Sequence, residues 1–209
     1  MPAQSFSATT IEYGVPRQRQ SPVSPNQDCP RHSDLVGHAF ATTWDVPGGT
    51  IGWITQLVDS ITMRQRYIAT QLLQTLKTHE VFKDVTIVGL VSSHPAVCNA
   101  LAKYAGVKVD EIDLEFIKTN ASSILSSTSV SYVKDAALRG SLFQDKEDYE
   151  PGAVSSAYTE FFVDHGEPLR ALETLQRRKE WCLGELLDGH EFVVLLPVPP
   201  KEVLFDGQG

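Results

Sequence analysis

The sequence predicts a mixed α/β (α+β) fold, in which a mostly antiparallel sheet carries helices on both faces, and three patterns support this prediction. A β-hairpin opens the regular part of the chain at residues 35–58. A helical pattern then separates this hairpin from a buried strand at 85–91, which implies a parallel crossover. Two more strands, at 153–165 and 191–198, imply antiparallel pairing near the C-terminus. Because these strands alternate with helices, we expect helical cover on both faces of the sheet.

The hairpin is predicted from two runs of small, aromatic and β-branched residues, "LVGHAFATTWDV" and "TIGWITQLV". The segment between them, "PGG", is typical of a turn because glycine tolerates a positive φ. After the hairpin, Ile68, Leu72 and Leu76 recur every four residues and form one apolar helical face. A helix is therefore predicted from Arg64 onward.

The remaining elements follow from apolar runs and from prolines. The segment "VTIVGLV" is short and rich in valine, which is typical of a strand buried on both faces. Pro95 and Pro168 each stand in the first turn of a predicted helix, where a missing N–H group is tolerated. Residues 111–150 predict short helices and an acidic loop, "DKEDYE".

Composition limits the classes of function. The chain has 209 residues, a formal net charge of −8 and a pI of about 5.2, which disfavours binding to bulk nucleic acid or to anionic membranes. Its three cysteines are far apart and odd in number, which suits a reducing compartment. No apolar run approaches the roughly 18 residues of a membrane span, and no signal pattern opens the chain, so a cytoplasmic location is expected.

Two parts of the chain are predicted, a disordered tail at residues 1–33 and a single folded domain at 34–209. The tail holds five prolines among serine, glutamine and asparagine, and it has no leucine. Such a segment cannot bury much apolar surface. Cys29 and His32 in the tail lack the other ligands of a metal site, so no metal is expected.

The stretch "MRQRYIATQLL" predicts an anion site at a helix start. A strand that leads through a tight loop into a helix presents unpaired N–H groups and the positive end of the helix dipole. A diphosphate is a natural occupant of such a place, and Arg64 and Arg66 would add charge. The plainer interpretation, a solvated basic helix start, stays open.

The longer stretch "WITQLVDSITMRQRYIATQLLQTL" resembles the central motif of the GNAT acyltransferase superfamily, whose loop reads Arg/Gln-x-x-Gly-x-Gly/Ala at the helix start. Arg64 falls on the first position, Tyr67 on the central glycine and Ala69 on the last small residue. The segment "VGLVSSHPAVCNALAKYAG" is similar to the next strand and helix of that fold. The C-terminal strand, helix and strand resemble a group of fungal GNAT-like proteins, and the similarity extends from Val36 to Val198.

The resemblance implies that acetyl-CoA lies in a cleft between two splayed strands. Backbone amides at the end of the first strand would hold the pantetheine and polarise the thioester carbonyl, and amides of the loop would hold the pyrophosphate. An acceptor amine or hydroxyl would then attack the thioester with general-base help. The cofactor-binding residues that the resemblance implies are Leu57, Val58, Arg64, Gln65, Arg66, Tyr67, Ile68, Ala69, Thr70 and Asn99.

Two features depart from the family pattern. Tyr67 replaces the glycine whose missing side chain lets a phosphate approach the backbone. A phenol there must swing away or fill the site, and in the second case Tyr67→Gly should tighten CoA binding. The family's N-terminal strand and helices, which shape the acceptor cleft, are missing or replaced here by the tail.

The candidate catalytic residues are His94, Asp164 and His165. His94 follows a buried strand and precedes Pro95, so it serves either as a base or cofactor contact or as a helix cap. Asp164 and His165 adjoin at the end of the predicted strand, and a carboxylate beside an imidazole can tune a base. Adjacent strand residues point to opposite faces, however, so both reach one cleft only if the strand ends there.

Three further residues have plainer interpretations beside the functional ones. Tyr104 is a candidate for the family's tyrosine acid, but its place in the aligned helix favours a core or rim position. Cys98 is interpreted as a buried, inert thiol because no basic partner is near it in sequence. Glu160 would share a strand face with Asp164, or else be solvated.

The sequence therefore predicts an acyltransferase that moves an acetyl group from acetyl-CoA to an amine or hydroxyl of a small molecule, in the manner of secondary metabolism. Two alternatives stay open: the same fold performing a cyclisation or isomerisation on a metabolite, and a non-catalytic pseudoenzyme that binds a ligand. The expected partner is a small-molecule acceptor, without nucleic acid or membrane, and a homodimer is left open.

Overall fold

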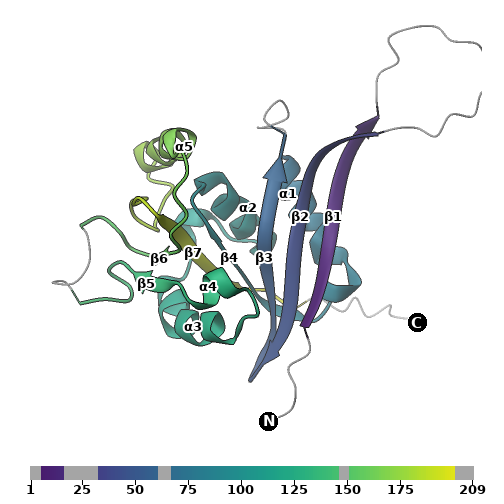
Figure 1. Cartoon of the computed structure of the whole chain (residues 1–209), viewed down its shortest axis with the longest axis horizontal. Coiled ribbons are helices and arrows are strands. Elements are labelled where there is room, and N and C mark those ends of the chain that lie inside the picture. The colour runs from purple at the N-terminus through teal and green to yellow at the C-terminus, as the bar shows by residue number, and fades with distance from the viewer. Residues whose placement is uncertain (1–5, 17–32, 61–66, 146–150, 201–209) are drawn as a thin grey trace, which may run out of the picture.

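A computed structural model describes residues 6–16, 33–60, 67–145 and 151–200, and it confirms the predicted mixed fold. Seven strands form one sheet in the order β1-β2-β3-β4-β7-β6-β5 (Figure 1). Every neighbouring pair is antiparallel except β3 and β4, which run parallel. The last strand, β7, lies between β4 and β6, so the chain returns to the middle of the sheet at its end.

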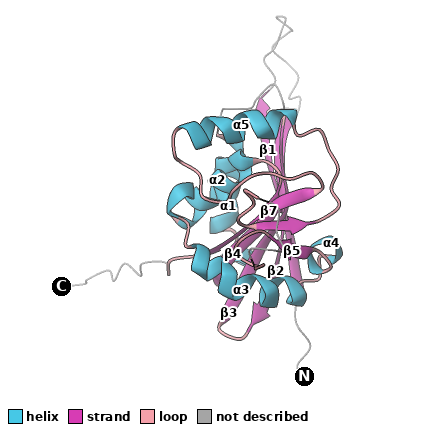
Figure 2. Cartoon of the chain, turned by 90° about the vertical axis from the view of Figure 1, so that its left-hand side faces the viewer, coloured by secondary structure: helices cyan, strands magenta, loops and turns pink. Residues whose placement is uncertain are grey.

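The strands are β1 (Phe6–Pro16), β2 (Ser33–Val46), β3 (Gly49–Asp59), β4 (Val85–Ser92), β5 (Ala137–Arg139), β6 (Ser156–Tyr158) and β7 (His190–Pro197). The helices are α1 (Ile68–Thr78), α2 (Pro95–Ala105), α3 (Leu114–Ser127), α4 (Ser131–Lys134) and α5 (Gly166–Arg177), with short 3-10 turns η2 (Glu80–Phe82) and η3 (Val109–Glu111). Figure 2 shows these elements from the side of α5.

Helices cover the two faces of the sheet unequally. The crossover helix α1 and the helix after β4, α2, pack behind the sheet in the view of Figure 1, and α5 packs beside α2. In front of the sheet, α3 contacts β7, and the indole N–H of Trp44 on β2 donates to Ser127 Oγ at the end of α3 over 3.0 Å. Trp44 packs against Trp53 in the same layer, and both indoles are fully buried. The prediction of helices on both faces is therefore confirmed.

The predicted β2–β3 hairpin is present with a two-residue turn. Val46 pairs with Gly49, which leaves Pro47 and Gly48 at the tip, and Gly48 has a φ of 100°. The left-handed region is accessible to glycine at little steric cost, so the "PGG" segment suits this turn.

The prediction of a disordered tail at 1–33 is wrong for Phe6–Pro16, which forms β1. This edge strand pairs antiparallel with β2 along its whole length. Composition misled here because an edge strand buries little of its own surface and is held by ladder hydrogen bonds to its neighbour. Residues 1–5 and 17–32 lie outside the described part of the chain. Among the described residues, a strand rather than a helix precedes the hairpin.

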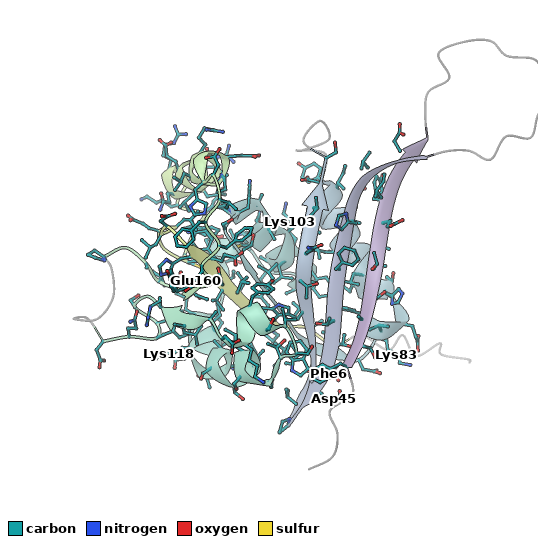
Figure 3. The ribbon with its side chains drawn as sticks, viewed as in Figure 1. Phe6, Asp45, Lys83, Lys103, Lys118 and Glu160 are labelled. Atoms are coloured by element: carbon teal, nitrogen blue, oxygen red, sulfur yellow. The ribbon has the colours of Figure 1, made fainter. Side chains whose placement is uncertain are left out.

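The strand predicted at 153–165 is also wrong over most of its length, since β6 covers Ser156–Tyr158 alone. The backbone turns at Glu160, which has a φ of 59°, and the N–H of Phe162 donates to the Glu160 carbonyl over 3.2 Å (Figure 3 labels Glu160). Asp164 and His165 therefore lie in the loop that leads into α5, not on a strand.

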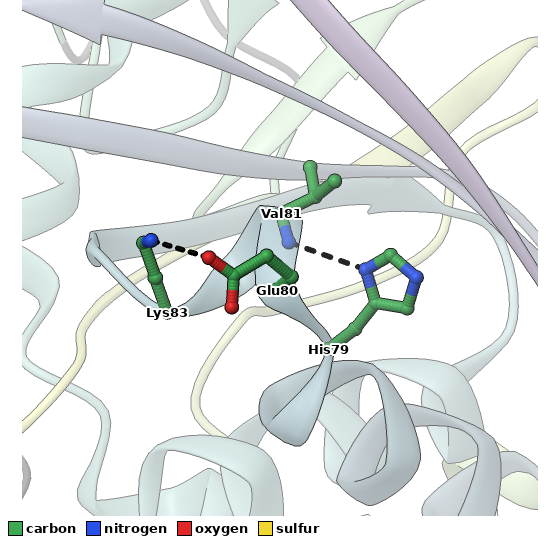
Figure 4. A network of polar contacts seen from close by, with 4 residues as sticks. All are labelled: His79, Glu80, Val81 and Lys83. Carbon is green, nitrogen blue, oxygen red and sulfur yellow. Dashed lines mark hydrogen bonds and ion pairs between the residues drawn. The ribbon is translucent and has the colours of Figure 1, made fainter.

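Histidine caps begin two of the helical segments. At η2, His79 Nδ1 accepts a hydrogen bond from the N–H of Val81 over 3.2 Å, and Lys83 pairs with Glu80 beside it (Figure 4). The other ring nitrogen of His79 lies 3.3 Å from Thr9 Oγ1, which ties this turn to β1. In the described residues, no helix is long and apolar enough to cross a membrane.

Candidate functional site

The parallel strands β3 and β4 separate toward their C-terminal ends. Their ladder runs from Thr50 opposite Val85 to Ile54 opposite Leu90, and beyond it β3 continues to Asp59 without pairing to β4. A β-bulge contributes to this divergence: between β2 and β3 the register shifts so that Thr55 is the extra residue. A bulge bends its strand and increases the local twist. Figure 1 shows β3 and β4 diverging at this end, which we call the β3–β4 junction.

A cavity of about 700 Å³ opens at the junction, on the side of α1, α2 and α5. The end of β3, the end of β4 and the starts of α1 and α2 form its inner walls, and one face of α5 forms its outer wall. It is lined by Leu57, Val58, Asp59, Ala69, Ser92, His94, Ala96, Val97, Glu167, Arg170, Ala171 and Thr174. The predicted site residues Leu57, Val58, Ala69 and His94 are thus brought together.

The start of α1 lies at the cavity. Tyr67 precedes the helix with φ 60° and ψ 20°, and among the described residues no side chain caps the first turn. The first N–H groups of a helix have no partner inside the helix, and they carry the positive end of its dipole. Because Ala69 of this turn lines the cavity, the start of α1 forms part of the cavity wall.

Tyr67 does not fill this cavity. Its side chain is 69% exposed, and Lys103 Nζ of α2 lies 5.5 Å from the ring centroid (Figure 3 labels Lys103). The ring is not among the cavity-lining groups. The backbone of Tyr67 is left-handed, a conformation that glycine adopts at less cost, so this position suits the glycine of the predicted motif. The phenol has swung away from the site.

His94 caps α2 and lines the cavity at once. Its Nδ1 accepts from the N–H of Ala96 over 3.1 Å, so the predicted capping role is confirmed. Because Nδ1 accepts this bond, a neutral His94 carries its ring proton on Nε2. Nε2 lies 3.8 Å from a carboxylate oxygen of Glu167 on α5.

The outer wall from α5 was not predicted as part of the site. Glu167, Arg170, Ala171 and Thr174 line the cavity at spacings of three and four residues, which is one helical face. The sequence contains this stripe, but its use depends on which neighbour α5 packs against. Arg170 provides a guanidinium at the cavity, while Glu167 and Asp59 provide carboxylates.

Other predicted site residues lie elsewhere. Asp164 Oδ1 accepts from the N–H of Gly166 over 2.8 Å, and His165 is the N-cap residue of α5, so both serve the start of that helix and neither lines the cavity. Asn99 is half-buried on α2, outside the cavity lining. Ile68 is buried against β2, and Thr70 is half-buried on α1. Arg64, Gln65 and Arg66 lie outside the described residues.

The thiol and phenol considered from sequence are core groups. Cys98 is fully buried, and burial raises the pKa of its thiol well above the ordinary range. Tyr104 is also buried, its hydroxyl makes no hydrogen bond in the described structure, and burial raises its pKa to about 12. Neither group lines the cavity, so both plainer interpretations fit.

A second cavity, of about 710 Å³, lies at the other edge of the sheet. Its lining comes from β5, β6 and the start of β7, and includes Arg139, Tyr158 and His190. The rings of Tyr158 and His190 are in contact, with centroids 4.9 Å apart. Within the described ranges, no group of three or more histidine, cysteine, aspartate or glutamate side chains is arranged to hold a metal ion.

Comparison with known proteins adds no further constraint: no protein-family model matches this chain, and no curated protein matches it.

Proposed function

We propose that the chain is a GNAT-like acyltransferase that transfers an acetyl group from acetyl-CoA to an amine or hydroxyl of a small molecule. The observation that carries this proposal is the cavity at the β3–β4 junction, where two parallel strands diverge. The resemblance noted above implies a cofactor in a cleft between two splayed strands. The same resemblance assigns the pantetheine to the strand end near Leu57 and Val58, both of which line the cavity.

The geometry of the cavity suits the two ends of the cofactor. Its apolar lining along Leu57, Val58 and Val97 suits the pantetheine arm. The uncapped start of α1, with Arg170 across the cavity, suits the pyrophosphate. At the other end, amides of the diverging strand β3 that do not pair with β4 are available to polarise a thioester carbonyl.

The proposal includes a small-molecule acceptor and a cytoplasmic location, where acetyl-CoA is available. His94 is a positioning residue in this scheme, because its Nδ1 fixes the start of α2 while its Nε2 stands at the cavity. Asp164 and His165 have no part in it.

Titration of acetyl-CoA into the pure full-length chain, followed by calorimetry, tests the proposal. We expect a dissociation constant in the micromolar range, about −8 kcal/mol of binding free energy. Ala171→Trp places an indole in the cavity and should abolish binding, whereas Ala8→Trp on the exposed part of β1 should not. No binding to wild type up to millimolar acetyl-CoA, or equal binding by the Ala171→Trp protein, would contradict it.

A further inference from the structure

Glu191 lies on β7, beside the C-terminal end of β4. Ser92, the last residue of β4, pairs with Phe192 of β7, so Glu191 lies one residue beyond this final pair. It therefore lies at the edge of the sheet toward which β3 and β4 diverge, with β4 between it and β3. Glutamate is an uncommon choice in a strand whose next five residues are apolar and buried.

The side chain of Glu191 lies on the opposite face of the sheet from the cavity. Side chains alternate along a strand, so Glu191 shares a face with Val193 and Leu195. Leu195 and Trp53 both lie over Gly89, on one face of the sheet. This is the face covered by α3, because Trp53 packs against Trp44, which bonds to Ser127 at the end of α3. The charge of Glu191 also acts on Tyr132 of α4, whose pKa burial and this carboxylate raise to about 12.

Tyr132 closes the junction on this face. Its hydroxyl donates to the carbonyl of Thr55, the bulged residue of β3, over 3.4 Å. The ring is 44% exposed, so the tyrosine lies between the diverging strands and solvent. A group bound at Glu191 would have this ring beside it and the strand ends beneath it.

Among the residues that the structure describes, no cation pairs with Glu191. The residue is 8% exposed. Thr159, the residue after β6, approaches the carboxylate and favours its charged form, but Thr159 Oγ1 does not reach full hydrogen-bond geometry. Burial dominates and raises the pKa of Glu191 above its ordinary value. A buried, uncompensated carboxylate is costly for the fold, and such groups gather at functional sites.

We propose that Glu191 binds the ammonium group of the acceptor and takes its proton before acyl transfer. This inference rests on the proposed function and specifies it: the acceptor is a primary amine, and it enters from the α4 face while acetyl-CoA enters from the cavity. A primary ammonium supplies a cation, which the described residues around Glu191 do not provide.

The proton balance of the step is as follows. One proton passes from the ammonium to the Glu191 carboxylate, and the neutral amine attacks the thioester carbon. The C–N bond forms, the C–S bond breaks, and the CoA thiolate leaves with its electron pair. The thiolate takes the second proton that the nitrogen sheds, and Glu191 returns its proton to solvent. Because burial raises the pKa of the Glu191 carboxyl toward that of the ammonium group, the transfer of the first proton to Glu191 is less unfavourable.

Paired probes test this site without relying on turnover. Benzylamine and benzyl alcohol share a ring and differ in charge, and NMR titration of each into the full-length chain, with and without CoA, measures the preference. We expect wild type to bind the amine at least tenfold more tightly, a difference of about 1.4 kcal/mol. Glu191→Gln keeps the shape of the side chain and should remove this preference. Glu173→Gln, which removes an exposed carboxylate on α5, should retain it.

The outcomes separate this inference from the proposed function. Acetyl-CoA affinity of Glu191→Gln should stay within twofold of wild type, because the cavity lies on the other face. The amine preference of wild type should also fall as the pH drops and the carboxylate is protonated. Equal binding of amine and alcohol by wild type, binding of neither, or a preference that survives in Glu191→Gln would overturn the assignment, even if acetyl-CoA binds as expected.

Discussion

The two faces of the β3–β4 junction differ in how they are built and in the charge they favour. On the cavity face, two helix starts and Arg170 meet the end of β3, and Glu167 is paired with His94. On the α4 face, the carboxylate of Glu191 on β7 is buried, and no cation of the described ranges pairs with it. One face suits an anionic cofactor and the other suits a cationic acceptor.

Under the proposed function, the same break in the sheet serves two ligands, one on each face. Where strands diverge, their backbone groups become available from both sides, while the layers above and below remain different. The cavity face is made of consecutive strand, loop and helix units. The α4 face combines β3, β7 and a four-residue helix that are far apart in sequence.

The largest change in CoA affinity is expected on removal of the Arg170 guanidinium from the cavity face. Arg170→Ala removes charge-assisted hydrogen bonds of about 1.5–3 kcal/mol, so CoA affinity should fall at least tenfold by calorimetry. Arg178→Ala is the matched control, because Arg178 follows α5 and does not line the cavity. If both variants lose affinity equally, overall charge rather than the cavity face attracts the ligand.

The raised pKa of Glu191 on the α4 face predicts that the stability difference between wild type and Glu191→Gln depends on pH. Because burial raises its pKa, the folded chain binds this proton more tightly than the unfolded chain does. Wild type should therefore lose stability as pH rises from the ordinary carboxyl value of 4.5 through the raised value, and Glu191→Gln should not suffer this loss. The other titratable groups that its charge reaches are Tyr132 and Cys98, and both are neutral at these pH values.

Melting temperatures of wild type and Glu191→Gln, measured from about pH 4 to about pH 8, test this. The melting temperature of Glu191→Gln should rise relative to that of wild type as the pH increases, and Glu173→Gln should show no such trend. A difference independent of pH would mean that Glu191 does not titrate differently in the folded chain.

The two histidine caps provide a matched pair. His94→Ala and His79→Ala should each lower the unfolding free energy by about 1 kcal/mol, since each removes one N-cap hydrogen bond. His94→Ala alone should also weaken CoA binding, because His79 lies away from the cavity. His94→Asn should restore most of the stability. Denaturant unfolding with parallel calorimetry distinguishes the two roles, and unchanged CoA affinity in His94→Ala would leave His94 as a cap alone.

The smallest effect is expected at Tyr67. Tyr67→Gly relieves a left-handed φ but loses the contact with Lys103, so stability should rise by about 0.5 kcal/mol. CoA affinity should stay within twofold, because the ring lies outside the cavity. Tyr67→Phe keeps the ring and the backbone and should match wild type in both measurements. A tenfold gain in affinity for Tyr67→Gly would restore the obstruction hypothesis.

Local patterns predicted the cavity face well. The hairpin, the helix through Ile68 and Leu72, and the valine-rich strand at 85–91 each follow from periodicity or turn chemistry, which neighbouring residues determine. Leu57, Val58, Ala69 and His94 were predicted because strand end, loop and helix start are consecutive in the chain.

Other features depended on distant contacts. β1 lacks strong apolar character and forms because β2 offers a free edge to pair with. The strand expected through Asp164 ends early because Glu160 adopts a left-handed turn against Gly189. No local sequence pattern marked Glu191 as a candidate site residue. Its position beside the end of β4 depends on β7 lying between β4 and β6, and this strand order cannot be predicted from neighbouring residues.

Hydrogen–deuterium exchange with and without acetyl-CoA tests the central claim most directly, namely that the β3–β4 junction binds the cofactor. We predict slower exchange in three segments that meet at the cavity, the end of β3 at Leu57–Asp59 and the first turns of α1 and α2. Exchange around Arg139 and His190, at the second cavity, should not change. Protection confined to that second cavity, or no protection at saturating acetyl-CoA, would contradict the account.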